Sequence, residues 1–294
     1  MNLNNLKKQK SIKELLEFGI INIDKPSGPT SFKVSEKVKL MLGLRKTSHF
    51  GTLDPKVTGV LPVALNRACK LTGHFLGEDK EYVGIMRIHE DIDVKEIEKT
   101  IKNKFTGVII QKPPVKSRVK RQERPREIKK FKLLEKNKQD ILFQAEVQGG
   151  TYIRKLLDDL GKELGIGAHM LELRRVRAGI FKEDDEKYPV VNLYDLEKAV
   201  DTYKKGDEKL LREMIIPGEI ITEIYPVVEI KRESVGRILH GQPIYDKDLV
   251  KVVRMGEGEK ISVFSAMQFI GVFKVINTKK IFAKSEFTFQ GIKI

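Results

Sequence analysis

The chain has 294 residues, 40% of them hydrophobic and 33% charged, and its formal net charge is +15. This length suits about two domains, and the composition is that of a charge-rich folded protein rather than a disordered one. No apolar run reaches the roughly 18 residues of a membrane-spanning helix. A single cysteine, Cys69, excludes an internal disulfide framework, so we expect a cytoplasmic protein. The basic excess predicts a polyanionic partner such as nucleic acid, with biased lysine usage as the alternative.

Two rigid loops hold the first candidate residues. INIDKPSGPTS contains Lys25 and Pro26, and HFGTLDPKVTGVLP, residues 49–62, contains His49 and a lone acid, Asp54. An Asp-Pro pair between glycines is a turn signature, so Asp54 could simply cap its own loop. The alternative is a loop-borne carboxylate that acts as a nucleophile or base, as in glycosidic-bond chemistry.

The densest positive charge lies in residues 112–132, KPPVKSRVKRQERPREIKKFK, where ten Lys or Arg face two Glu. Its prolines argue against a continuous helix and favour an extended, protruding loop or ribbon. A solvated charge run is one explanation. Phosphate contact that positions RNA without reading its sequence is the one we favour.

TYIRKLLDDLGKELG has apolar residues at three- and four-residue spacing, which predicts an amphipathic helix with Thr151 as N-cap and an end at Gly165. Arg154 lies in its first turn, where a cation opposes the helix dipole. We therefore expect a carboxylate partner for Arg154, and a buried arginine would keep such a carboxylate ionised and aimed. The alternation in residues 142–148 predicts a half-buried strand, and LRRVRAG at 173–179 is a second basic cluster.

After Tyr225 the predicted elements become short. PVVEIK reads as a strand, ESVGRILHG as a helix, and VKVVRM, KISVFSAM and FIGVFKVIN as strands joined by glycine turns. We expect a small mixed barrel over residues 223–294 and a main domain over residues 18–222. Residues 1–17 are an N-terminal extension, with packing on the C-terminal domain as one option.

Taken in order, INIDKPSGPTS, HFGTLDPKVTGVLPVAL, KEYVG, IIQKPPVKSRVKR, GGTYIRKLLDDLG, GIGAHMLELRRVRAG and YPVVEIK resemble the motifs of the TruB/dyskerin family of pseudouridine synthases. The resemblance covers about residues 18 to 280. It looks most like the archaeal branch, the catalytic subunit of box H/ACA ribonucleoproteins. It implies an α+β pseudouridine synthase fold, with a mixed, mainly antiparallel central sheet flanked by helices, followed by a PUA-like RNA-binding β-barrel.

The resemblance also implies catalytic roles. Asp54 matches the catalytic aspartate, Arg154 the arginine that forms a salt bridge with it, and Tyr82 the tyrosine that stacks on the flipped uracil. Leu173 matches an apolar residue on the other side of that pocket. His49 matches a histidine that helps to extrude the target nucleotide.

Further positions follow from the same resemblance. Lys25 and Pro26 match the loop that braces the active site, and we place them among the substrate-binding positions. Residues 112–132 correspond to the thumb that closes on RNA, with four candidate contacts: Lys116, Arg118, Lys120 and Arg121. Phe50 departs from the small residue usual beside the histidine, and we expect it to alter how the flipped nucleotide is lodged.

The implied reaction isomerises specific uridines in RNA to pseudouridine and uses no metal or other cofactor. The implied partners are guide RNA, rRNA or tRNA substrates, small box H/ACA proteins and a kink-turn-binding ribosomal-type protein, with no membrane partner. Two alternatives stay open: a stand-alone enzyme acting on the tRNA T-loop, and a non-catalytic RNA-binding scaffold.

Overall fold

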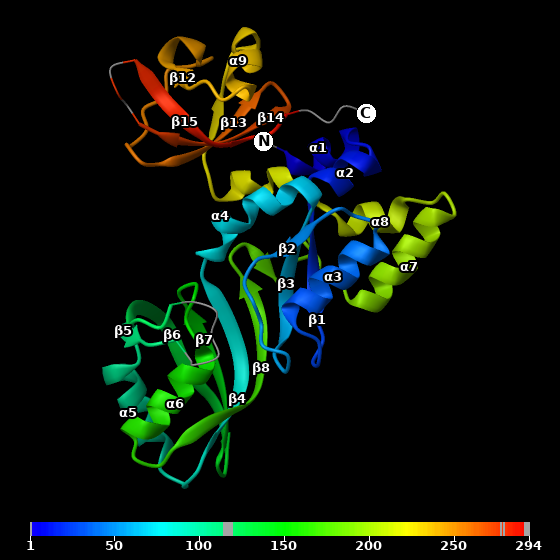
Figure 1. Cartoon of the computed structure of the whole chain (residues 1–294). Helices are drawn as coiled ribbons and strands as arrows, with labels where there is room; N and C mark the ends of the chain where they lie inside the picture. Colours follow the sequence, from blue (N-terminus) through cyan, green and yellow to red (C-terminus); the bar gives the residue numbers. More distant parts are fainter. Residues whose placement is uncertain (1, 114–119, 277, 279, 291–294) are drawn as a thin grey trace. The chain divides into compact units, whose positions relative to one another are not determined.

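The computed structural model describes residues 2–113, 120–276, 278 and 280–290 (Figure 1). The chain divides into two compact units, Ile20–Met214 and the combination of Met1–Gly19 with Ile215–Ile294. No helix in the described part of the chain is both long and apolar enough to cross a bilayer.

The larger unit is built on one mixed sheet. Its strands lie in the order β1-β3-β8-β4-β7-β6-β5, with β2 paired to β3 and β9 to β8. The β3–β8 pair is parallel and the other described pairs are antiparallel, which confirms the predicted fold class. The elements are β1 (Gly19–Lys25), α3 (Ser31–Met41), β2 (Thr47–His49), β3 (Thr58–Leu65), α4 (Thr72–Leu76), β4 (Lys80–Ile88), α5 (Val94–Lys104), β5 (Gly107–Gln111), β6 (Arg124–Asn137), β7 (Asp140–Val147), α6 (Ile153–Glu163), β8 (Ala168–Ala178), β9 (Phe181–Lys182), α7 (Leu193–Lys204) and α8 (Lys209–Met214).

Helices cover one face of this sheet. Along β7, Ile141, Phe143 and Ala145 are fully buried while the residues between them are partly exposed, as the predicted alternation requires. Helices α5 and α6 lie side by side against the strands around β7 (Figure 1). The apolar stripe of α6, which includes Leu156 and Leu160, is fully buried.

Part of the basic segment 112–132 is a strand, because its residues from Arg124 onward form the first half of β6. Pro125 pairs with Ile110 of β5, at a point where β6 has not yet begun to pair with β7. A proline is tolerated there because its missing N–H would face the unpaired side of the strand. The extended geometry that the prolines predicted is therefore present, but as a sheet strand.

The smaller unit contains a five-stranded sheet in the order β11-β13-β14-β15-β12, which curls into a half-barrel. The N-terminal residues belong to this unit: the Phe18 ring lies 4.3 Å from that of Phe289, and Lys10 forms an ion pair with Glu219. Its elements are α1 (Leu3–Gln9), α2 (Ile12–Glu17), β10 (Ile216–Pro217), β11 (Val227–Glu229), α9 (Val235–Leu239), β12 (Ile244–Tyr245), β13 (Lys260–Ser265), β14 (Gln268–Val275) and β15 (Ile281–Thr288).

One strand prediction in this unit is wrong. The described residues 250–255, VKVVRM, form no strand. The preceding residue, Leu249, makes only an isolated bridge, to Ile230. Val252 is 94% exposed. The segment is a connection to β13 whose Val253 and Met255 are partly buried against the core of this unit, while Val250 and Arg254 are exposed.

Candidate active site

A cleft of about 650 Å³ opens on the larger unit. It gathers the loop before β3, the start of β4, the start of α6 and the middle of β8, which are far apart in the sequence. Its lining residues include Leu53, Asp54, Lys80, Tyr82, Tyr152, Arg154, Leu173 and Arg175. Three residues proposed from sequence as the catalytic set, Asp54, Tyr82 and Arg154, therefore meet in one place.

Arg154 finds its partner in Asp54, with 2.9 Å between Nε and Oδ2. The prediction of a buried arginine is wrong, because the Arg154 and Asp54 side chains are 54% and 43% exposed. The predicted N-cap is also wrong: Tyr152 holds that position without a side-chain cap, and the Thr151 hydroxyl donates to the Gln148 carbonyl. An exposed ion pair contributes only about 0–1 kcal/mol, so this pair matters more for aiming the carboxylate than for stability.

The loop that carries Asp54 is held in place by Lys25, whose side chain is fully buried. The Lys25 ammonium donates to the carbonyls of Pro26 at 2.9 Å, Pro55 at 2.9 Å and Val57 at 2.8 Å. Burial lowers the pKa of Lys25, while the charge of Asp54 opposes that shift. Lys25 thus fixes the backbone on the C-terminal side of Asp54. All three of its donors are used there, so direct substrate contact is not its role in this geometry.

Tyr82 and Leu173 are cleft residues on neighbouring strands, and the register pairs Tyr82 with Arg175 and Gly84 with Leu173. Tyr82 and Leu173 are therefore diagonal neighbours on one face, where such pairs are roughly 7–8 Å apart. Both side chains therefore line the same part of the cleft. A Cβ on Gly84 would lie 2.6 Å from the Glu172 carbonyl oxygen and 2.8 Å from Leu173 Cδ1, so the close approach of the β8 backbone requires glycine here.

Arg175 is a cleft residue that sequence reasoning missed. It is 1% exposed, and its guanidinium donates to the carbonyls of Val60 at 2.8 Å and Gly51 at 3.1 Å. Burial lowers the pKa of Arg175, and a hydrogen bond with Tyr82 opposes that shift. Arg175 therefore links Tyr82 to the backbone on both sides of Asp54, at Gly51 and Val60.

Lys80 was missed as well. It is 4% exposed, and its ammonium donates to the carbonyls of Leu76 at 2.8 Å, Phe75 at 3.3 Å and Glu78. Burial lowers the pKa of Lys80 to about 8, with the charge of Arg175 acting in the same direction. The position of Lys80 two residues before Tyr82 places it on the same strand face, and that spacing was the signal available in the sequence.

His49 lies next to the cleft rather than among its lining residues. Its Nε2 is 3.2 Å from the hydroxyl of Thr52, which does line the cleft. Burial and then the charge of Arg175 lower the pKa of His49, which favours a neutral ring. The expected influence of Phe50 on the nucleotide is not supported by its position: Phe50 is 1% exposed and stacks at 4.7 Å on Phe75, inside the core.

The predicted thumb contacts divide into two pairs. Lys116 and Arg118 lie outside the described residues, whereas Lys120 and Arg121 are described and exposed. Pro26, predicted beside Lys25, is exposed at the surface of its loop.

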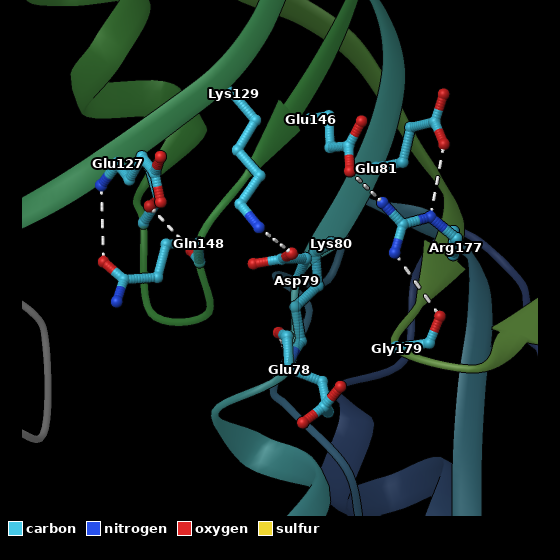
Figure 2. Close-up of polar contacts among 11 residues, drawn as sticks. Glu78, Asp79, Lys80, Glu81, Glu127, Lys129, Glu146, Gln148, Arg177 and Gly179 are labelled. Carbon is cyan, nitrogen blue, oxygen red and sulfur yellow. Dashed lines mark hydrogen bonds and ion pairs between the residues drawn. The ribbon is translucent and has the colours of Figure 1, made fainter. Parts of the chain in front are cut away.

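The second basic cluster is neutralised within its own unit. Arg174 pairs with Asp24 and Glu183, and Arg175 is buried. Figure 2 shows the guanidinium of Arg177 between Glu81 and Glu146, with Nη2 2.7 Å from Glu146 Oε1. These arginines therefore stabilise the sheet and are not available as a phosphate-binding surface.

The chemistry that this site can perform centres on one carboxylate. Within the described residues, no three His, Cys, Asp or Glu side chains lie together as metal ligands would. Tyr82 and Leu173 line the same cleft as Asp54, so a base that enters it lies in the cleft that also holds this carboxylate.

Comparison with known families agrees with this geometry. Residues 39–153 match the TruB family pseudouridylate synthase N-terminal domain, and residues 154–222 match the tRNA pseudouridylate synthase B C-terminal domain. A probable tRNA pseudouridine synthase B of Methanopyrus kandleri is 43% identical over 87% of this chain and 75% of its own length. The corresponding protein of Methanocaldococcus jannaschii is 43% identical over 93% of this chain and 81% of its own length.

Solved structures give the same result. A Cbf5-Nop10-Gar1 complex contains a chain that matches 97% of this one and 88% of its own length, with TM-score 0.87 and 38% identity. An archaeal box H/ACA Nop10-Cbf5 complex matches 97% of this chain and 90% of its own, with TM-score 0.85 and 36% identity. The fold and site thus define an RNA pseudouridine synthase. The chain belongs to the TruB family, in the part of it that these archaeal proteins represent.

Proposed function

We propose that this chain isomerises specific uridines in RNA with Asp54 as the catalytic carboxylate, and that it does so as the catalytic subunit of a box H/ACA guide-RNA particle. The observation that carries the catalytic assignment is the Asp54–Arg154 pair in a cleft of about 650 Å³ that Tyr82 and Leu173 also line. A cytoplasmic location is part of the proposal, because the proposed RNA substrates are there.

In the proposed reaction the N1–C1′ bond of uridine breaks, the uracil rotates, and a C5–C1′ bond forms. The C5 proton is released and N1 gains a proton, so no oxidant or reductant is consumed. Asp54 either adds to C1′ or assists deprotonation of the sugar, and it acts as the ionised carboxylate that Arg154 holds at 2.9 Å.

The target nucleotide must first leave its stack, which costs a few kcal/mol. Stacking on Tyr82 recovers roughly 1–3 kcal/mol of that, and phosphate contacts supply the rest. His49, held neutral next to the cleft, is placed to act during extrusion. Lys25 and Arg175 position the Asp54 loop through its carbonyls.

The comparisons support two different modes of substrate choice. One structural relative comes from a Cbf5-Nop10-Gar1 complex and another from an archaeal box H/ACA Nop10-Cbf5 complex, which supports guided action on rRNA with small protein subunits. The named relatives are described as tRNA pseudouridine synthases, which supports a second, guide-independent activity on the tRNA T-loop. A kink-turn-binding ribosomal-type protein completes the proposed guided particle.

A reconstitution assay separates these modes. The purified protein is incubated with a tRNA transcript alone, and in parallel with a box H/ACA guide RNA, its complementary target and Nop10- and Gar1-type proteins. Pseudouridine is mapped by release of the C5 tritium and by primer extension. Guided action predicts product at the guide-specified uridine only when guide and partners are present.

Product in tRNA without a guide would support the T-loop activity. Normal assembly of guide RNA with no pseudouridine in either reaction would favour the non-catalytic scaffold and overturn the proposal.

A further inference from the structure

Helix α3 presents two large apolar side chains to solvent, Phe32 at 64% exposure and Leu40 at 71%. Single exposed apolar residues are common on protein surfaces and carry no meaning by themselves. The two differ in position, because Phe32 lies in the first turn of α3 and Leu40 lies two turns further along. Among the described residues, the first turn and the loop before it carry hydrogen bonds to the loop around Asp54.

That attachment is direct. The Ser31 hydroxyl accepts a hydrogen bond from the Leu53 N–H at 2.8 Å and donates to the Leu53 carbonyl at 3.0 Å. The Gly28 N–H donates to the Pro55 carbonyl at 2.9 Å. The residues on both sides of Asp54 are therefore bonded to the segment that ends at Phe32. The exposed ring of Phe32 thus directly follows Ser31, which is hydrogen-bonded to the catalytic loop.

Two lysines follow the hydrogen-bonded anchors in the sequence, and Glu36 lies one helical turn beyond Phe32. Lys33 follows Phe32, Lys56 lies two residues beyond Asp54, and both are exposed. Within the part of the chain that the structure describes, neither lysine has a carboxylate partner, in contrast to Lys129, which pairs with Asp79 (Figure 2). An exposed aromatic ring flanked by unpaired cations is the combination that single-stranded nucleic acid binds, through base stacking and phosphate contacts.

We propose that Phe32 stacks on a base of the substrate RNA next to the extruded uridine, with Lys33 and Lys56 contacting the adjoining phosphates. The proposal rests on RNA being the substrate of the cleft. In this proposal the surface beside the Asp54 loop holds the RNA strand from which the target uridine has been extruded. A protein interface of this kind would need a continuous apolar patch, whereas this surface offers one ring and two lysines. RNA is therefore the favoured occupant.

The test compares Phe32→Ala with Phe32→Trp, and uses Leu40→Ala as a matched control on the same helix. RNA affinity is measured by fluorescence anisotropy with a T-arm hairpin, and with a guide-paired target in the assembled particle. Each RNA carries 2-aminopurine next to the target uridine, so that stacking quenches its fluorescence. Loss of one stacked base predicts about a 10-fold weaker Kd for Phe32→Ala.

We expect Phe32→Ala to lose the quenching while keeping the kcat at saturating RNA, Phe32→Trp to restore both affinity and quenching, and Leu40→Ala to match the wild type. Unchanged affinity and quenching in Phe32→Ala on both RNAs would overturn the proposal. So would equal losses in Phe32→Ala and Leu40→Ala, or normal RNA binding with lost binding of a protein subunit. Because binding is read separately from product, an inactive wild type would count against the proposed reaction and not against this contact.

Discussion

Replacing Lys25 with methionine tests whether the Asp54 loop is held by a buried cation. The substitution removes three hydrogen bonds of 2.8–2.9 Å to the carbonyls of Pro26, Pro55 and Val57. Hydrogen bonds to a charged group contribute about 1.5–3 kcal/mol each. Relief of the several kcal/mol needed to bury an ammonium offsets a large part of this gain. We expect the free energy of unfolding to fall by about 2–4 kcal/mol, the remainder of those two terms.

We expect Lys25→Met to impair catalysis more than it impairs folding. A shift of about 1 Å in a reacting group costs on the order of 100-fold in rate, so we expect kcat for Lys25→Met to fall by about 10- to 100-fold. The RNA Kd should stay within about twofold of wild type, because Lys25 is fully buried and makes no contact at the surface. Single-turnover tritium release and chemical denaturation measure the two effects, with Lys37→Met, an exposed lysine on α3, as the control. A normal kcat, or a Kd that weakens by as much as kcat falls, would refute the reasoning.

Three further predictions concern the frame of the cleft. Gly59→Ala should lower the free energy of unfolding by about 2–4 kcal/mol, because φ is +99° and the new Cβ would lie 2.3 Å from the Arg175 carbonyl oxygen. Gly73→Ala, with nothing within 4 Å, is its control, and equal stability of the two variants would contradict the strain. Phe50→Ala should lower the free energy of unfolding by about 3–5 kcal/mol, because it leaves a cavity in the core, and it should keep the RNA affinity. A loss of RNA affinity in a variant that stays stable would instead show that Phe50 acts in the site. For Lys80, the folded-state pKa of about 8 lies below the ordinary 10.5, so the unfolded chain binds more protons between these pH values and stability rises with pH. The unfolding free energy of the wild type relative to Lys80→Met should therefore increase by up to about 3 kcal/mol from pH 8 to pH 10.5, and a flat difference in urea titrations would show that Lys80 is not a buried cation.

Local sequence was sufficient for the parts of the site that depend on one segment. The unfavourable place of Arg154 in the first turn of a helix predicted a carboxylate partner, and Asp54 is that partner at 2.9 Å. Alternation predicted β7, and the apolar stripe predicted α6. Each of these inferences rests on a periodicity or a charge that can be read within about fifteen residues.

The missed features depend on burial that only the assembled sheet decides. Arg175 stands in a run that reads as surface charge, yet β8 lies between β3 and β4, so Arg175 is buried and bonded to Val60 and Gly51. Phe50 follows His49 directly, but consecutive side chains in an extended segment point to opposite sides, and the ring enters the core. The half-exposed state of Arg154 could likewise not be read from its residue type.

Asp54→Asn tests the central claim most directly, because the amide keeps the shape of the side chain and removes its charge. Pseudouridine formation is measured under single-turnover conditions on an RNA that the wild type modifies, together with the RNA Kd. We predict no detectable pseudouridine and a Kd within about twofold of wild type, since phosphate contacts and base stacking rather than this acid supply the affinity. Product formed by Asp54→Asn at the wild-type rate would contradict the account.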